Sequence, residues 1–290
     1  MTWSNNSRWA QLLVRASSSL AFRSRRFARD VRLGVFSLQL VVKRRRSLAA
    51  STAEGVTVLI ATWNTAHYLR VVIAALRRFT LEPIQILVID NDSSDDTVAM
   101  LEADHPDVQL LRLRRNVGHG LALDAGMHRA RTDVVVVLDV DAFPISPHWL
   151  DEVIGPLSQG YSLSGASFND YIHPCVAAMK RDLFLQNHYT FDASYTRRLR
   201  IRRRGWPKGW DAGKLITVLD QGRHHHIPVT AQRGPRSLGT VFGDAVYHHF
   251  YSTNSDAPVS PAESAQAWAE AVAKYLPTGG DDARATEPST

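Results

Sequence analysis

Cysteine is nearly absent from the sequence, since Cys175 is the single one among 290 residues. A lone cysteine excludes an internal disulfide and fits a reducing compartment such as the cytoplasm. A catalytic thiol is not expected either, because the flanking residues Ile-His-Pro and Val-Ala-Ala-Met are typical of a packed strand.

Long apolar runs are missing from the N-terminal region. The longest one there, residues 33–42, has about half the length that a helix needs to cross a bilayer. Arginines interrupt the stretch that would have to be apolar in a cleavable signal. We therefore expect a cytoplasmic protein, with peripheral contact at the inner face of the membrane as the remaining option.

Acidic residues are scarce in the first 50 residues, which contain 11 of the 34 Lys and Arg but only Asp30 as an acid. The rest of the chain has 23 basic and 27 acidic residues, so the net charge of +6 comes from the extension. This balance makes a nucleic-acid partner unexpected, although a local basic site is not excluded.

Residues 1–54 are predicted to be a basic extension with an amphipathic helix. Apolar residues recur in it at helical spacing: Trp9, Leu12, Leu13, Ala16 and Leu20. Such a helix could lie on an anionic membrane, which makes peripheral membrane contact through residues 1–50 one option. The alternatives are a frayed basic tail and a helix packed on its own domain.

Strands and helices alternate from residue 55 onward. Apolar runs over residues 56–61, 84–90, 108–113 and 134–138 are separated by helical patterns over 66–79, after Ser93 and Ser94, and over 121–131. This order predicts a three-layer α/β sheet. One domain is expected over residues 55–276, with halves 55–145 and 146–276, followed by a disordered tail, 277–290.

In the second half, strands and helices no longer alternate regularly. Strands are predicted over residues 161–168 and 173–179, and helices to residue 157 and over 181–186, 214–221 and 262–275. Only strand-like turns are expected between residues 222 and 251.

The apolar run Val-Val-Val-Val-Leu, residues 134–138, leads directly to Asp139 and Asp141. Such a run is typical of a strand that is covered on both faces. The two carboxylates point alike, because side chains on an extended chain repeat every second residue. Like charges this close are costly unless a cation lies between them, which predicts a divalent metal site. A helix cap is the alternative role, for which Ser146 competes.

Four ordered motifs together resemble the family 2 glycosyltransferases of the GT-A fold. They are VTVLIATWN, ILVIDNDSSDDT, RNVGHGLALDAGMHRA and VVVVLDVDAF, all within residues 55–160. The form D-N-x-S-x-D is similar to the rhamnosyltransferase-like branch. The resemblance implies a three-layer α/β/α sandwich with a mostly parallel central sheet. It also implies a nucleoside diphosphate sugar as donor and an inverting, Mn- or Mg-dependent transfer.

The resemblance also implies roles for residues at the strand ends. The base would contact the end of the first strand, at Thr62 with Trp63 and Asn64, although Trp63 could equally pack at the strand end. Further nucleotide-sugar contacts would come from Asp90, Asn91, Asn116, Gly118 and Asp124. Asp124 could instead lie on a helix surface. Ser93 and Ser94 are expected to cap the helix that follows them. Asp139 would contact both ribose and metal, and Asp141 would bind the metal directly.

A catalytic base is implied late in the chain, where family members carry an acidic residue at a helix start. Asp211 in Gly-Trp-Asp-Ala-Gly is the best match, with Asp170 and Asp220 as the other options. Helix capping alone is the alternative role of Asp211.

Histidines late in the chain are the candidates for a third metal ligand. His248 or His249 would complete the site, and because neighbours on a strand point oppositely only one can do so. We favour His248. The run 224–226, three histidines, is expected to be a solvated turn and not a ligand.

The acceptor is expected to carry a hydroxyl group, as in a glycan, glycolipid precursor or secondary metabolite. Seven cations in residues 197–208, with Trp206 and Trp210, could close over donor phosphates or receive an anionic, lipid-linked acceptor. Three other functions remain: a glycosyltransferase acting on nucleic-acid bases, a nucleotidyltransferase and an inactive nucleotide-sugar-binding module. A nucleotidyltransferase would carry a glycine-rich basic loop after the first strand, which is missing here.

Overall fold

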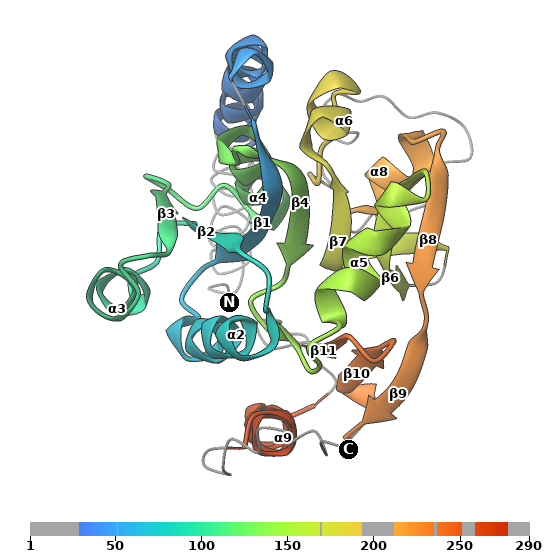
Figure 1. Ribbon diagram of the computed structural model, residues 1–290. Coiled ribbons are helices and arrows are strands. Elements are labelled where there is room, and N and C mark those ends of the chain that lie inside the picture. Colours follow the sequence, from blue (N-terminus) through green and yellow to red (C-terminus); the bar gives the residue numbers. More distant parts are fainter. Residues whose placement is uncertain are drawn as a thin grey trace, which may run out of the picture.

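The computed structural model describes residues 29–50, 52–168, 170–192, 212–234, 237–250 and 259–277. Its main sheet has seven strands in the order β3-β2-β1-β4-β7-β6-β8 (Figure 1). The bounds of these strands are β1 Ala53–Thr62, β2 Ile84–Asp90, β3 Gln109–Arg112, β4 Thr132–Leu138, β6 Tyr161–Phe168, β7 Tyr171–Lys180 and β8 Arg223–Ile227. Strand β7 is antiparallel to both its neighbours, and the other pairs are parallel.

Helices cover both faces of this sheet, which gives the three layers. The apolar run of β4 shows why, because Val136 and Leu138 belong to one core cluster while Val135 and Val137 belong to the other. The first cluster includes residues of α2 Ala66–Phe79, α3 Thr97–Asp104 and α5 Trp149–Ser158. The second includes residues of α4 His119–Arg129, α6 Arg181–Gln186 and α8 Lys214–Leu219.

A smaller antiparallel sheet, in the order β5-β11-β10-β9, lies below the main sheet in Figure 1. Its strands are β5 Ala142–Pro144, β9 Val229–Arg233, β10 Gly239–Phe242 and β11 Val246–His249. Helix α9, Pro261–Tyr275, packs on it through Trp268, whose ring meets Phe143 edge to face at 5.3 Å between centroids. Because β5 starts directly after Asp141, the small sheet ties the end of the chain to the end of β4.

The residues 29–49 form a helix that lies against the second core cluster. Leu33 and Phe36 pack on that cluster, and Leu40 is 8% exposed. The Arg181 guanidinium, fully buried, donates a hydrogen bond to Ser47 O at 2.7 Å. Residues 29–49 therefore form a helix packed on its own domain, which was one of the three options for the extension. Residues 1–28 lie outside the described residues.

The expected three-layer architecture is confirmed, and the structure corrects two local expectations. The three histidines 224–226 belong to strand β8 and not to a turn, and the segment after them forms the strands β9, β10 and β11. Within the described ranges, no helix is both long and apolar enough to span a bilayer.

Candidate functional site

The loops after β1 and β2 are joined to each other by Asn64. This residue has a left-handed φ of 54°, and its Oδ1 accepts hydrogen bonds from Ser94 N at 2.7 Å and Asp95 N at 3.3 Å. Asn64 N donates to Ser93 Oγ at 3.0 Å. The asparagine therefore fixes the shape of the carboxyl edge of the sheet, where ligands of open α/β folds bind.

The end of β1 presents Trp63 rather than Thr62. The Thr62 side chain is 2% exposed, and its Oγ1 is hydrogen-bonded to Thr65 Oγ1 at 2.7 Å. Trp63 is 49% exposed, so ordinary packing does not account for this side chain. A large aromatic surface is thus open to solvent beside the loop that Asn64 organises.

The end of β2 is connected to the loop before α4 by two asparagines. Asn91 Nδ2 donates to Asn116 Oδ1 at 3.2 Å, and Asn91 Oδ1 accepts from Val117 N at 2.9 Å. A carboxylate at position 91 could accept the second bond but could not donate the first. Gly118, with φ of 88°, then starts α4 in a conformation that favours glycine.

The structure corrects the expectation that the two serines of the β2–α3 loop cap the next helix. The N-cap of α3 is Asp96, without a side-chain cap bond. Ser93 N instead donates to Asp90 Oδ1 at 3.3 Å, and Asp90 is 2% exposed. Asp95, which the sequence reasoning missed, accepts from Thr97 N at 3.1 Å and so orders the start of α3.

Asp124 lies in the interior, so the option of a helix-surface aspartate is wrong. Its carboxylate is 5% exposed and accepts hydrogen bonds from Thr190 Oγ1 at 2.5 Å and from Phe191 N at 2.8 Å. These contacts hold the segment after α6 against α4. They give no support to a contact between Asp124 and a sugar.

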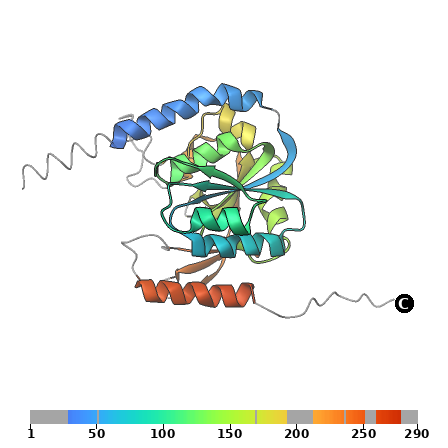
Figure 2. The same cartoon turned by 90° about the vertical axis from the view of Figure 1, so that its left-hand side faces the viewer.

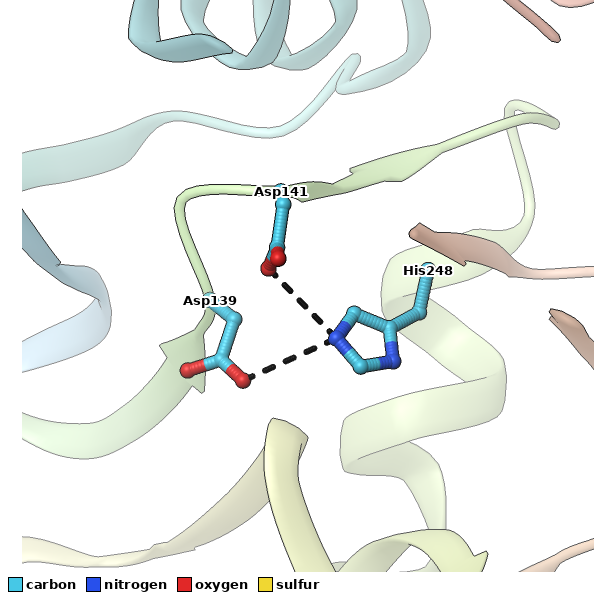
Figure 3. Close-up of side chains that lie close together, drawn as sticks. All are labelled: Asp139, Asp141 and His248. Carbon is cyan, nitrogen blue, oxygen red and sulfur yellow. Dashed lines mark ion pairs between the residues drawn. The ribbon is translucent and has the colours of Figure 1, made fainter. Parts of the chain in front are cut away.

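Asp139, Asp141 and His248 converge where β4 passes into the small sheet (Figure 3). Their ligand atoms all lie within 4.8 Å of one another. His248 Nε2 is 3.4 Å from Asp141 Oδ1 and 3.8 Å from Asp139 Oδ2. The pairing of β5 with β11 causes this approach, because it places Ala142 opposite His248. Neither aspartate caps α5, whose N-cap is His148 without a side-chain bond.

Imidazoles balance the charge of the two aspartates. His119, at the start of α4, lies with Nε2 3.2 Å from Asp139 Oδ1. Burial alone would raise the pKa of Asp139, but His119, His173 and His248 outweigh it and lower the pKa. Burial alone would lower the pKa of His248, but Cys175 and Asp141 raise it well above its ordinary value. The sequence motifs contained no signal for the contact between His119 and Asp139, which only the fold creates.

His249 faces away from this cluster, as expected for neighbours on a strand. Its Nε2 is 3.0 Å from Ser264 Oγ on α9, and its Nδ1 is 3.2 Å from Tyr247 OH. Burial lowers its pKa to about 4. Cys175 is fully buried in β7, which agrees with the packed strand expected there.

Asp211, the expected catalytic base, lies outside the described residues, as does the cationic segment 197–208. Of the two other options, Asp220 is 8% exposed and accepts from Tyr189 OH at 2.8 Å and Ser162 Oγ at 2.5 Å. These bonds make Asp220 a structural residue. Asp170 Oδ1 lies 3.2 Å from Lys214 Nζ, and the Asp170 side chain is 78% exposed.

The three histidines of β8 do not join the aspartate cluster. His224 Nε2 is 2.8 Å from Asp220 Oδ2, and the His225 ring meets Tyr161 edge to face at 5.5 Å. Across the ranges that the structure describes, Asp139, Asp141 and His248 are the one group of three or more His, Cys, Asp or Glu side chains close enough to share a metal ion. A carboxylate-rich set with one imidazole fits a divalent cation.

Part of the chain is similar in sequence to known proteins. The chain is 32% identical over 120 residues to the undecaprenyl-phosphate 4-deoxy-4-formamido-L-arabinose transferase of Pectobacterium atrosepticum, covering 39% of this chain and 36% of the relative. It is 26% identical over 117 residues to the poly-beta-1,6-N-acetyl-D-glucosamine synthase of Staphylococcus aureus, covering 40% and 27%. The matched part thus spans about a third of the length of such curated relatives.

A solved structure with a similar fold is the mannosyltransferase PcManGT of Pyrobaculum calidifontis in complex with GDP-Man and Mn²⁺. It is 19% identical, with a TM-score of 0.46 over 69% of this chain and 66% of that one. The family model described as glycosyl transferase family 2 matches residues 57–217. These contain the two aspartates and, apart from the first four residues of β1, every strand of the main sheet except β8. The chain belongs to glycosyl transferase family 2.

Proposed function

We propose that this glycosyltransferase moves a sugar from a nucleoside diphosphate donor to a hydroxyl group, with inversion at the anomeric carbon and with a divalent cation. The observation that carries the proposal is the convergence of Asp139, Asp141 and His248 at the edge where β4 ends. Family membership supports sugar transfer over the nucleotidyltransferase, the inactive module and the base-modifying enzyme.

The residues present suit a bound Mn²⁺ or Mg²⁺. Two carboxylates supply the oxygen ligands that these hard cations prefer, and the imidazole of His248 favours Mn²⁺ of the two. When bound, the cation stabilises the negative charge that forms on the departing nucleoside diphosphate. The imidazoles of His119, His173 and His248 lower the pKa of Asp139, so this carboxylate is available as a charged ligand.

The donor is proposed to lie along the half over residues 55–145. Trp63 offers its exposed ring to the base, and the loops fixed by Asn64 and Asn91 surround the base and ribose. Asp90 and Asn116 would contact the nucleoside, and Gly118 leaves room for the phosphates at the start of α4. The form D-N-x-S-x-D over residues 90–95 is the ground for proposing a place in the rhamnosyltransferase-like branch.

Asp211 is proposed as the base on the acceptor side, residues 146–276. The residues that follow it pack on β7, since a Cβ at Gly213 would lie 2.7 Å from Ile172 O. His173, next along β7, has its ring 5.8 Å from that of His248. The carboxylate would take the acceptor's proton as its oxygen attacks the anomeric carbon. The bond between that carbon and the phosphate oxygen breaks, and its electrons leave with the diphosphate.

The acceptor is proposed to be a glycan, a glycolipid precursor or a secondary metabolite. One relative is named an undecaprenyl-phosphate 4-deoxy-4-formamido-L-arabinose transferase. Among the options, this name favours an anionic, lipid-linked acceptor.

Two substitutions test the proposal against a matched control. Asp141→Ala should abolish Mn²⁺ binding, measured by calorimetry, and lower transfer from a panel of nucleotide sugars at least about 1,000-fold. Asp211→Asn should lower transfer by about 100-fold or more while leaving donor binding unchanged. Asp151→Ala, on the exposed first turn of α5, should change neither. Full transfer by Asp141→Ala would show that the aspartate pair is not the donor site.

A further inference from the structure

The helix over residues 29–49 has apolar side chains on two opposite faces. Its inner face packs on the domain through Leu33, Phe36 and Leu40. Its outer face carries four exposed residues at spacings of four, three and four, which places them in one row. These are Val31, Val35, Leu38 and Val42, with exposed fractions of 48%, 48%, 62% and 71%, and we call them the outer stripe.

Cations border the outer stripe on both sides. At 100° per residue, Arg45 falls on one side, and Arg32, Lys43 and Arg46 fall on the other. All four are exposed. Asp30 is the one acid among residues 29–50. An apolar row between cationic borders is the pattern of a helix that lies in the interface of an anionic membrane.

The orientation of the outer stripe is fixed by contacts of the inner face. Ser47 O accepts a hydrogen bond from buried Arg181 at 2.7 Å, and Ser47 Oγ lies 3.1 Å from His128 Nδ1. Arg44 contacts His188 beside α6. These contacts prevent the helix from turning its outer stripe inward. In Figure 2 the helix runs along one outer edge of the molecule. The exposed fractions of the four stripe residues show that these side chains are open to solvent.

We propose that the outer stripe docks on the surface of an anionic lipid bilayer. The four apolar side chains would enter the boundary between headgroups and acyl chains along about 16 Å of helix, given a rise of about 1.5 Å per residue. The bordering cations would reach the lipid phosphates. A second copy of the chain is a poorer occupant, because two such faces would bring cations against cations. The inference goes beyond the proposed sugar transfer and does not depend on it.

Vesicle flotation of the full chain tests the docking surface. The wild type should float with vesicles of phosphatidylcholine and phosphatidylglycerol and much less with phosphatidylcholine alone. Leu38→Glu combined with Val42→Glu should weaken flotation at least about tenfold. Arg45→Gln with Arg46→Gln should weaken it about fivefold for each arginine removed. The matched control is Leu81→Glu with Val229→Glu, which adds the same two charges at exposed apolar positions elsewhere and should float like the wild type.

A fluorescent label measures the contact at the stripe itself. Cys175 is the single cysteine and is fully buried, so a cysteine introduced at the surface will be labelled selectively. A polarity-sensitive dye on Leu38→Cys should shift its emission to the blue when anionic vesicles are added. The same dye on Leu81→Cys, at a position 79% exposed, should not shift.

Three results would overturn the proposal. The wild type could fail to float, or the Leu38→Glu, Val42→Glu variant could float undiminished, which would assign membrane contact to residues 1–28 instead. The variant could also abolish a dimer that the wild type forms without lipid, which would make a second copy the occupant. Thermal unfolding of each variant checks its fold. Sugar transfer in solution should be unchanged in the stripe variant, so failure of the docking surface and failure of the proposed enzyme are separable.

Discussion

The two faces of β11 carry the same side chain in opposite electrostatic surroundings. His248 and His249 are adjacent, and they are 3% and 0% exposed. The pKa of His248 is raised well above its ordinary value, whereas burial lowers the pKa of His249 to about 4. Burial acts in the same direction on both rings. The neighbours on the site face, above all Cys175 and Asp141, therefore decide the difference.

Of the four effects that we expect, the loss of Mn²⁺ affinity on removal of the His248 ring should be the largest. We expect His248→Ala to weaken Mn²⁺ binding by about 100-fold or more, since even residues that only support a ligand cost about 10- to 100-fold. Without Mn²⁺, the unfolding free energy should change less, because the pairing of β11 with β5 and β10 is made by the backbone and not by the His248 ring. Calorimetric titration with Mn²⁺ measures the first effect and urea unfolding the second. Unchanged Mn²⁺ affinity would exclude His248 from the site.

Removal of the His249 ring should have the opposite result, a large loss of stability with little loss of Mn²⁺ affinity. His249→Ala leaves a cavity and removes the partners of Tyr247 OH and Ser264 Oγ, which we expect to lower the unfolding free energy by about 2 to 4 kcal/mol. Mn²⁺ affinity of the folded protein should stay within about threefold of the wild type, given the opposite directions of neighbouring side chains. The same two measurements apply. A large loss of Mn²⁺ affinity without a loss of stability would contradict the assignment of the two faces.

The pH dependence of Mn²⁺ binding tests whether His248 is a metal ligand. A metal ligand must be neutral imidazole, and the raised pKa of His248 keeps it protonated beyond its ordinary value of 6.5. Mn²⁺ affinity should therefore rise by about tenfold per pH unit up to that raised pKa and then level off. Calorimetry across pH 6 to 9, approximately, would measure the slope. A flat profile would mean that no proton leaves the site.

The pH dependence of the unfolding free energy tests the lowered pKa of His249. We expect this to be the smallest of the four effects. Because the folded pKa of His249 is about 4 and its ordinary value is 6.5, the unfolded chain binds more protons between these values. The contribution of this ring is complete above pH 6.5 and is lost as pH falls toward 4. As pH falls from 6.5 to 4, the unfolding free energy of the wild type should therefore decrease by about 1 to 2 kcal/mol more than that of His249→Phe. Equal pH profiles for both chains would show that His249 does not titrate in this way.

The elements that local pattern specifies were predicted well. The unbroken apolar run of β4 indicated a strand covered on both faces, and its residues divide between the two core clusters. The strand β6 and the helix α6 begin and end at the predicted residues. Here hydrophobic periodicity and length are enough, because each element is long or lies between clear breaks.

Side-chain partners across the fold were not readable from the pattern. His119 reaches Asp139, and Ser93 turns to Asp90 instead of capping α3, because of where separate loops meet. The strands of the small sheet have three to five residues, too few to show a period, and their pairing joins distant segments. The histidines of β8 suggested a turn because polar residues on an edge strand look the same as a solvated loop.

The proposed metal site lies between the two sheets, with two aspartates following the main sheet and the histidine on the small one. His248 comes 109 residues after Asp139, so on the ribosome the two carboxylates emerge long before their partner. Until β11 pairs with β5, the aspartates lack the imidazole that His248 supplies. In the proposed site, a cation bound by all three side chains would link the two sheets, and its binding to the folded chain alone would add to the stability of that link.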